Sequence, residues 1–247
     1  AASDVYKRQT VPEYHYDPSS YEARVYQGFG HGDYDALLKL GPNIKDWPEI
    51  APLGDNLLLK VASYITDPVT TTDELIPSGE TSSYRSNPLG LAEFTLSRKD
   101  PQYVGRAKEI QKAEKERMNG GHPCQAVPVL KDVMGEVKKQ YPDANRENTG
   151  FGSTIFAVKP GDGSAREQAA SCQKVLGGWA NIANEYATKR YRSNLINWGM
   201  LPFLIPEGDL PFTNGDYIFV PEIRKAVEEK ADVIKAYVVK DLSLIHI

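Results

Sequence analysis

The sequence predicts an α/β domain in which helices pack on a layered sheet. Short apolar runs rich in β-branched residues alternate along the chain with charged segments of helical periodicity. Glycine-rich turns separate the two kinds of segment. The composition, 40% hydrophobic and 25% charged over 247 residues, is ordinary for a globular protein and is sufficient to bury such a sheet.

Each expected element depends on a local pattern. The helix expected at 103–118 has apolar residues at Val104, Ala107, Ile110 and Ala113 and ends at a glycine pair. Further helices are expected at 86–94, 127–140, 167–175, 187–198 and 222–229. Short apolar runs predict strands at 57–62, 154–158, 177–183, 200–205 and 233–239, and 214–220 is expected to be a turn into a strand.

Charge and cysteine content exclude several functional classes. A formal net charge of −4 gives no electrostatic basis for nucleic-acid or anionic-membrane partners. No apolar run approaches the roughly 20 residues of a transmembrane helix, and no signal pattern begins the chain, so a cytoplasmic location is expected. Cys124 and Cys172 are too far apart for a disulfide framework or a local metal site, and we interpret both as small apolar residues.

The two ends differ from the rest of the chain. Residues 1–9 and 242–247 resemble translated sequencing-adapter read-through and are set aside from the fold prediction. The start also lacks Met, so we interpret the chain as an internal or C-terminal piece of a longer protein. Residues 10–56 predict an irregular arm or linker, because they are rich in Tyr, Gly, Asp and Pro and have no sustained period. The compact domain is expected from 57 to 241.

The strand expected at 154–158 leads into a glycine turn and then a helix. Gly161 and Gly163 form the turn, and Ser164 is expected to cap the helix by accepting from the backbone N–H groups of Arg166 or Glu167. Free N–H groups at a helix start favour a carboxylate or phosphate, and Arg166 adds a charged fork. From these residues alone, an ordinary capped helix with a surface arginine is the alternative.

Four segments resemble motifs of the aconitase family. Gly161–Ala170, followed by Leu176–Gly178, resembles Gly-x-Gly-Ser-Ser-Arg-Glu-His-Ala-Ala and Leu-Gly-Gly. Asn194–Pro202 is similar to the family's Asn-Leu-x-x-x-Gly-Leu-Leu-Pro, and Thr71–Gly79 to its Thr-Thr-Asp-His-Ile-x-x-Ala-Gly loop. Gly41–Ile44 also has a counterpart at the start of the domain. Four motifs in the right order make this resemblance specific, whereas the glycine turn alone would be weak.

The resemblance implies the swivelling C-terminal β/β/α domain of an aconitase-type hydratase. In that family the domain closes over core domains that carry a [4Fe–4S] cluster. Those domains and their three cluster cysteines are absent from this sequence, so 10–56 is interpreted as the linker to them and they are its expected partners. Cys124 and Cys172 lack Cys-x-x-Cys spacing and are not expected to bind the cluster or any metal.

The same resemblance implies roles for individual residues. Ser164 takes the general-base position, which removes the proton α to a carboxylate. Arg166 takes a position that binds a substrate carboxylate. Arg85 takes that of a second such arginine, with a solvated loop residue as an equal alternative. Asp73 takes the position of a loop aspartate that orients the site, although it could only cap the next turn.

Three substitutions depart from the family motifs. Ala165 replaces the second serine, and together with Gly163 it flanks Ser164 among the expected substrate-binding positions. Gln168 replaces the motif histidine, and Glu74 replaces the histidine after the loop aspartate. These changes indicate a divergent branch of hydratases and leave the identity of the acid open.

The expected function is therefore hydro-lyase chemistry on a tricarboxylic hydroxy acid such as citrate or isocitrate, and the expected small-molecule partner is a tri- or dicarboxylate. The fragment alone is expected to be inactive, because the cluster that acts as Lewis acid is elsewhere. One alternative is a related acid, namely homoaconitate, 2-methylcitrate or isopropylmalate. Others are a cluster-free regulatory or RNA-binding relative, and a small subunit that works beside a separate large subunit.

Overall fold

The computed structural model describes residues 13–24, 30–240 and 243–246, so the end expected to be foreign at 1–9 lies outside the described residues. The chain divides into two compact units, 1–39 and 40–247. In the first unit, α2 (Ser19–Glu22) is a single helical turn. All elements discussed below belong to the second unit.

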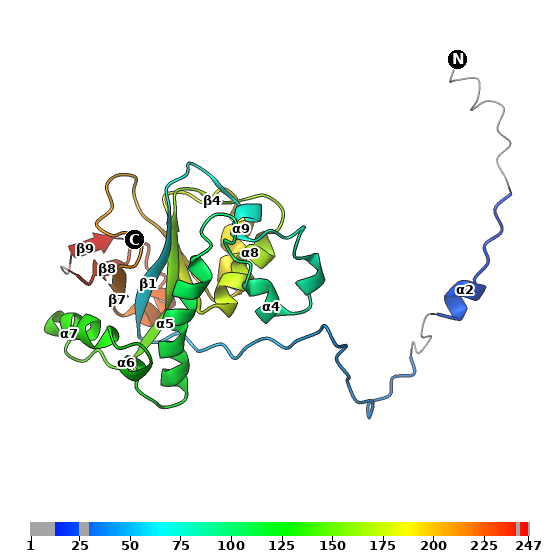
Figure 1. Cartoon of the computed structure of the whole chain (residues 1–247), viewed down its shortest axis with the longest axis horizontal. Helices are drawn as coiled ribbons and strands as arrows, with labels where there is room; N and C mark the ends of the chain where they lie inside the picture. Colours follow the sequence, from blue (N-terminus) through cyan, green and yellow to red (C-terminus); the bar gives the residue numbers. More distant parts are fainter. Residues whose placement is uncertain (1–12, 25–29, 241–242, 247) are drawn as a thin grey trace, which may run out of the picture. The chain divides into compact units, whose positions relative to one another are not determined.

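The second unit is built on a mixed seven-stranded sheet (Figure 1). Its spatial order is β6-β5-β3-β1-β7-β8-β9. The first four strands in this order are parallel to one another, and β7, β8 and β9 extend the sheet in antiparallel fashion. The strands are β1 (Asn56–Ile65), β3 (Thr149–Ala157), β5 (Gly178–Ala183), β6 (Leu201–Leu204), β7 (Tyr217–Val220), β8 (Lys235–Val238) and β9 (Ser243–His246).

The parallel strands are connected through helices that pack beside the sheet. The helical elements are α3 (Thr72–Leu75), η1 (Ser82–Tyr84), α4 (Pro88–Ala92), α5 (Tyr103–Met118), α6 (Pro123–Ala126), α7 (Leu130–Gln140), α8 (Arg166–Val175), α9 (Lys189–Asn197) and α10 (Ile223–Glu228). Two short strands, β2 (Thr70–Thr71) and β4 (Pro160–Asp162), form a separate parallel pair. In Figure 1, α5 runs alongside the sheet and α8 and α9 are neighbours.

The helix expected at 103–118 has those bounds in α5, whereas the helix expected to begin at 127 is shorter. Val127 has φ −134° and ψ 87° and ends α6, and α7 begins only at Leu130. The reason is Pro128, because proline disfavours helical geometry in the residue before it.

The central strands are buried on both faces. Leu57, Leu59 and Val61 of β1 point into a core with strands β5 to β8, and Leu58 packs on the other face with Ile110 of α5. A third core cluster joins α4, α8 and α9 to the first half of α5. Burial on both faces explains why the sequence of β1 is a nearly continuous apolar run. The fold confirms the α/β class predicted from the sequence.

Candidate active site at the glycine turn

The two short strands bring two distant motifs together. Thr70 pairs with Pro160 and Thr71 with Asp162, and the Thr70 N–H donates to the carbonyl of Lys159 over 3.0 Å. Helix α3 contacts both β4 and α8. The loop that carries Asp73 therefore lies beside the turn that carries Ser164.

Both glycines of the turn have positive φ and are closely packed. Gly161 has φ +96°, and a Cβ atom there would lie 2.4 Å from the ring of Tyr191. Gly163 has φ +131°, and a Cβ atom there would lie 2.2 Å from Oγ1 of Thr72. Only glycine adopts such conformations readily and allows this approach. The turn is thus held between α9 and α3.

Ser164 is exposed but does not cap α8 as expected. The helix begins at Arg166, and Ala165 occupies the cap position with φ −81° and ψ 44°. Among the residues that the structure describes, no side chain caps this helix start. The prediction failed because the turn continues one residue further than the sequence indicates. The consequence is that the N–H groups at the start of α8 lack a side-chain acceptor, an arrangement suited to an anion.

Arg166 lies in the first turn of α8 and is half-buried. Its Nε atom is buried and has no hydrogen-bond partner among the residues that the structure describes. A buried donor without an acceptor is unfavourable. A carboxylate is the natural partner for such a guanidinium, because it can accept two parallel N–H bonds.

The start of α3 is fixed by a reciprocal cap. Thr71 accepts from the Glu74 N–H over 3.2 Å, and the Glu74 carboxylate accepts from the Thr71 N–H over 2.7 Å. Thr71 is therefore the capping residue, and Asp73 lies inside the helix. Partial burial acts to raise the pKa of the Glu74 carboxyl, but its bonds to Thr71 and Lys99 outweigh this and hold the pKa below its usual range.

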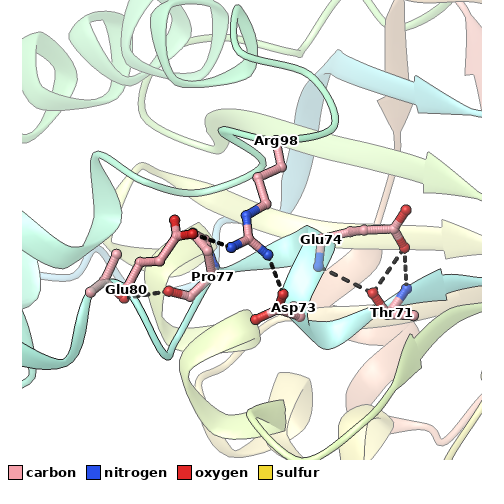
Figure 2. Close-up of polar contacts among 7 residues, drawn as sticks. Thr71, Asp73, Glu74, Pro77, Glu80 and Arg98 are labelled. Carbon is pink, nitrogen blue, oxygen red and sulfur yellow. Dashed lines mark hydrogen bonds and ion pairs between the residues drawn. The ribbon is translucent and has the colours of Figure 1, made fainter.

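Asp73 is exposed and paired with Arg98, which also binds Glu80 (Figure 2). Figure 2 shows the Arg98 guanidinium between the two carboxylates, while Glu74 turns away toward Thr71. Hydrogen bonds and charge attraction from Glu80 and Asp73 raise the pKa of Arg98 further. Sequence reasoning missed Arg98, because no local motif indicates a partner so far along the chain.

Arg85 follows the short helix η1 and is exposed. Helix η1 packs against α4, and α4 packs against α8. The segment that carries Arg85 is therefore connected to the helix that carries Arg166 through α4. That the two guanidinium groups bind one ligand remains a prediction.

Next to the glycine turn, the side chains of Asn181, Gln173 and Tyr191 form a buried triangle of hydrogen bonds. Asn181 donates to Gln173 over 2.7 Å, Gln173 donates to the Tyr191 hydroxyl over 2.9 Å, and that hydroxyl donates to Asn181 over 2.7 Å. All three side chains are buried, and they join α8, β5 and α9. The Tyr191 ring is also the surface on which Gly161 rests. This network was not foreseen from the sequence.

The residues present do not fit an iron–sulfur cluster. Cys172 is buried in the core, and burial raises the pKa of its thiol to about 12, which opposes the thiolate that a cluster needs. Cys124 packs against a different core cluster, which includes Met134. Among the described residues, no group of three or more His, Cys, Asp or Glu side chains is placed to hold a metal ion.

The fold and the turn define an α/β domain with a serine and an arginine at an uncapped helix start. Residues 107–208 match the family model described as the aconitase C-terminal domain. The match confirms the resemblance identified from the motifs. The match includes the glycine turn and α9, whereas the loop at 71–79 lies outside it.

Among solved structures, the chain is similar to 3-isopropylmalate dehydratase from Methanocaldococcus jannaschii. The two proteins are 18% identical, and the alignment covers 76% of this chain and 80% of that one with a TM-score of 0.47. No curated protein matches the chain. Across the part of the chain that the structure describes, no helix combines the length and apolar character needed to span a bilayer.

Proposed function

We propose that this chain is the C-terminal swivel domain of an aconitase-type hydratase that acts on a tri- or dicarboxylic hydroxy acid. The observation that supports this most strongly is Arg166, whose buried Nε lacks a partner at the same turn as the exposed Ser164. The family match over 107–208 provides the reaction class.

In this proposal Arg166 and Ser164 have different roles. The Arg166 guanidinium and the free N–H groups of α8 bind one carboxylate of the substrate. Ser164, exposed beside them and deprotonated to its alkoxide, takes the proton from the carbon α to a carboxylate and becomes a neutral hydroxyl. The positive groups at the helix start would stabilise the negative charge that the serine oxygen carries before it takes the proton. Asp73, held by Arg98, orients the opposite side of the turn.

The substrate proposed first is citrate or isocitrate, and a related acid such as homoaconitate, 2-methylcitrate or isopropylmalate fits as well. Ala165 supplies no hydroxyl beside Ser164, and Glu74 is occupied by its bonds to Thr71. Both features change the polar contacts available to a third carboxylate. Arg85 is proposed as the second carboxylate-binding arginine.

The iron–sulfur cluster of the family is proposed to belong to other domains of the full protein, which would be the partners of this one. The isolated chain is therefore expected to bind the acid without converting it. Turnover of citrate or aconitate by the isolated chain would contradict this assignment.

Two experiments test the function. Calorimetric titration of the chain with each acid should give measurable binding for at least one of them, and Ser164→Ala should leave that binding within about threefold. In the full-length protein Ser164→Ala should lower kcat by about 100-fold or more, as loss of a general base requires. Unchanged kcat in that variant would remove Ser164 from the mechanism.

A further inference from the structure

A hollow lies near the C-terminal end of α8, at the opposite end of the helix from Ser164 and Arg166. Its volume is about 430 Å³, within the usual range for a small-molecule site. It lies between residues 50–53 and the chain that follows α9. Trp198 lines it, and the centroid of the Trp198 ring is 4.5 Å from that of the Trp47 ring. The apolar side chains that form most of its wall include Ile50, Leu53, Ile196, Trp198, Met200 and Leu201.

Lys174 is the charged residue of this wall. The residue is 6% exposed, and its Nζ lies 3.5 Å from the centre of the Trp179 ring and 3.4 Å from the Gly199 carbonyl oxygen. Trp179 and Gly199 also line the hollow, so the ammonium group lies at its wall. An ammonium has three donors, and in the described residues only the long bond to Gly199 uses one of them.

The charged neighbours of Lys174 do not neutralise it. Burial lowers the pKa of Lys174 to about 8, and the nearby Glu114 carboxylate acts in the opposite direction. Glu114 is already bound by Arg117 and by the Phe151 N–H over 2.9 Å. Glu49 and Lys115 line a smaller hollow that Lys174 also borders. At pH 7 the group is therefore mostly an ammonium that lacks a carboxylate.

We propose that this hollow binds an organic anion with a compact apolar body, whose carboxylate accepts from Lys174. A neutral apolar ligand would leave the buried charge without a partner, which is unfavourable. A tricarboxylate would place two further charges against apolar side chains such as Ile50 and Met200. The ligand class is thus a monocarboxylate with an aliphatic or aromatic body. This site is separate from the glycine turn and independent of its proposed function.

Octanoate and octanol are suitable probes, because they share an apolar chain and differ in charge. The full chain is titrated with each at pH 7, with the fluorescence of its tryptophans and calorimetry as readouts. Octanoate should bind at least about tenfold more tightly than octanol, as one charge-assisted hydrogen bond implies. Lys174→Met should remove this preference and leave octanol binding unchanged. Lys112→Met, which removes an exposed lysine from α5, is the matched control and should change neither affinity.

The unaltered protein provides a second test that needs no variant. The affinity for octanoate should fall as the pH rises above about 8, where Lys174 loses its proton, and the affinity for octanol should stay constant. Equal affinities for the two probes would overturn the proposal. So would octanoate binding that persists in Lys174→Met, or no detectable binding of octanoate at about 10 mM, a concentration at which even weak sites fill.

Discussion

Gly163 of the glycine turn lies directly against Thr72 of α3, so close that a Cβ atom on the glycine would stand 2.2 Å from the threonine Oγ1. Thr72 itself is buried. The contact joins the loop that carries Asp73 to the turn that carries Ser164. The geometry of the candidate site therefore depends on the absence of a side chain at one position.

Replacing this glycine should separate the two segments. Gly163→Ala adds a methyl group that collides with Thr72 and requires φ +131°, which is strained for alanine. We expect a loss of about 1–3 kcal/mol in the free energy of unfolding, measured by urea denaturation. Gly105→Ala, in the first turn of α5 where nothing lies within 4 Å, is the control and should stabilise the chain by about 0.5–1 kcal/mol. Equal effects of the two substitutions would contradict the packing described here.

The buried triangle of Asn181, Gln173 and Tyr191 gives a second prediction. Tyr191→Phe removes the hydroxyl that donates to Asn181 and accepts from Gln173, and leaves a buried amide oxygen short of a donor. The free energy of unfolding should fall by about 1–3 kcal/mol. Tyr84→Phe alters an exposed tyrosine and should have an effect below about 0.5 kcal/mol. A Tyr191→Phe variant as stable as the parent would mean that the triangle contributes little.

The cap of α3 predicts a pH dependence. The pKa of Glu74 is held below its ordinary value of 4.5, so its contribution to stability is present above that pH and is lost as the pH falls through the lower, folded-state pKa. Glu74→Ala should lower the free energy of unfolding by about 1 kcal/mol at pH 7, the usual effect of a helix cap. The difference from the parent should shrink as the pH falls below 4.5.

Glu74→Gln separates the cap from the charge, because glutamine can accept the same backbone N–H. Its stability should exceed that of Glu74→Ala at pH 7 and should lack the acidic transition attributed to residue 74. A difference between parent and Glu74→Ala that stays constant down to pH 2 would show that ionisation of Glu74 is not involved. The readout is the urea midpoint at each pH.

The sequence was sufficient for the fold class and for most of its elements, because periodicity is a local property. The apolar positions of α5 and the run of β1 follow from neighbouring residues alone. Of β3, only the second half was predicted, because the strand begins at Thr149 and not at 154. The order of strands in the sheet and the short β2–β4 pair depend on contacts between distant segments, which no local pattern encodes. Within the candidate site, the glycine turn could be predicted from the sequence. Gly161 and Gly163 both have positive φ, a conformation that favours glycine.

The interaction partners of the site residues could not be predicted from the sequence. Arg98 binds Asp73 from a different segment, and Ser164 misses the cap position by one residue because the turn is longer than its glycines suggest. Helix starts are uncertain by one or two residues in any pattern-based prediction. Whether Ser164, Arg166, Arg85 and Asp73 act on one ligand, with Gly163 and Ala165 beside it, remains a prediction that binding experiments must test.

Arg166 distinguishes a binding residue from a structural one. Its Nε is buried without a partner, so Arg166→Met removes an unsatisfied donor and should change the free energy of unfolding by less than about 1 kcal/mol. The same substitution should weaken binding of the acid by about tenfold or more, because a charge-assisted pair to its carboxylate is lost. Arg190→Met, at an exposed position of α9, removes the same charge and should alter neither quantity. A large loss of stability in Arg166→Met with unchanged acid binding would show that the guanidinium serves the fold, and the proposed carboxylate site would then have to be placed elsewhere.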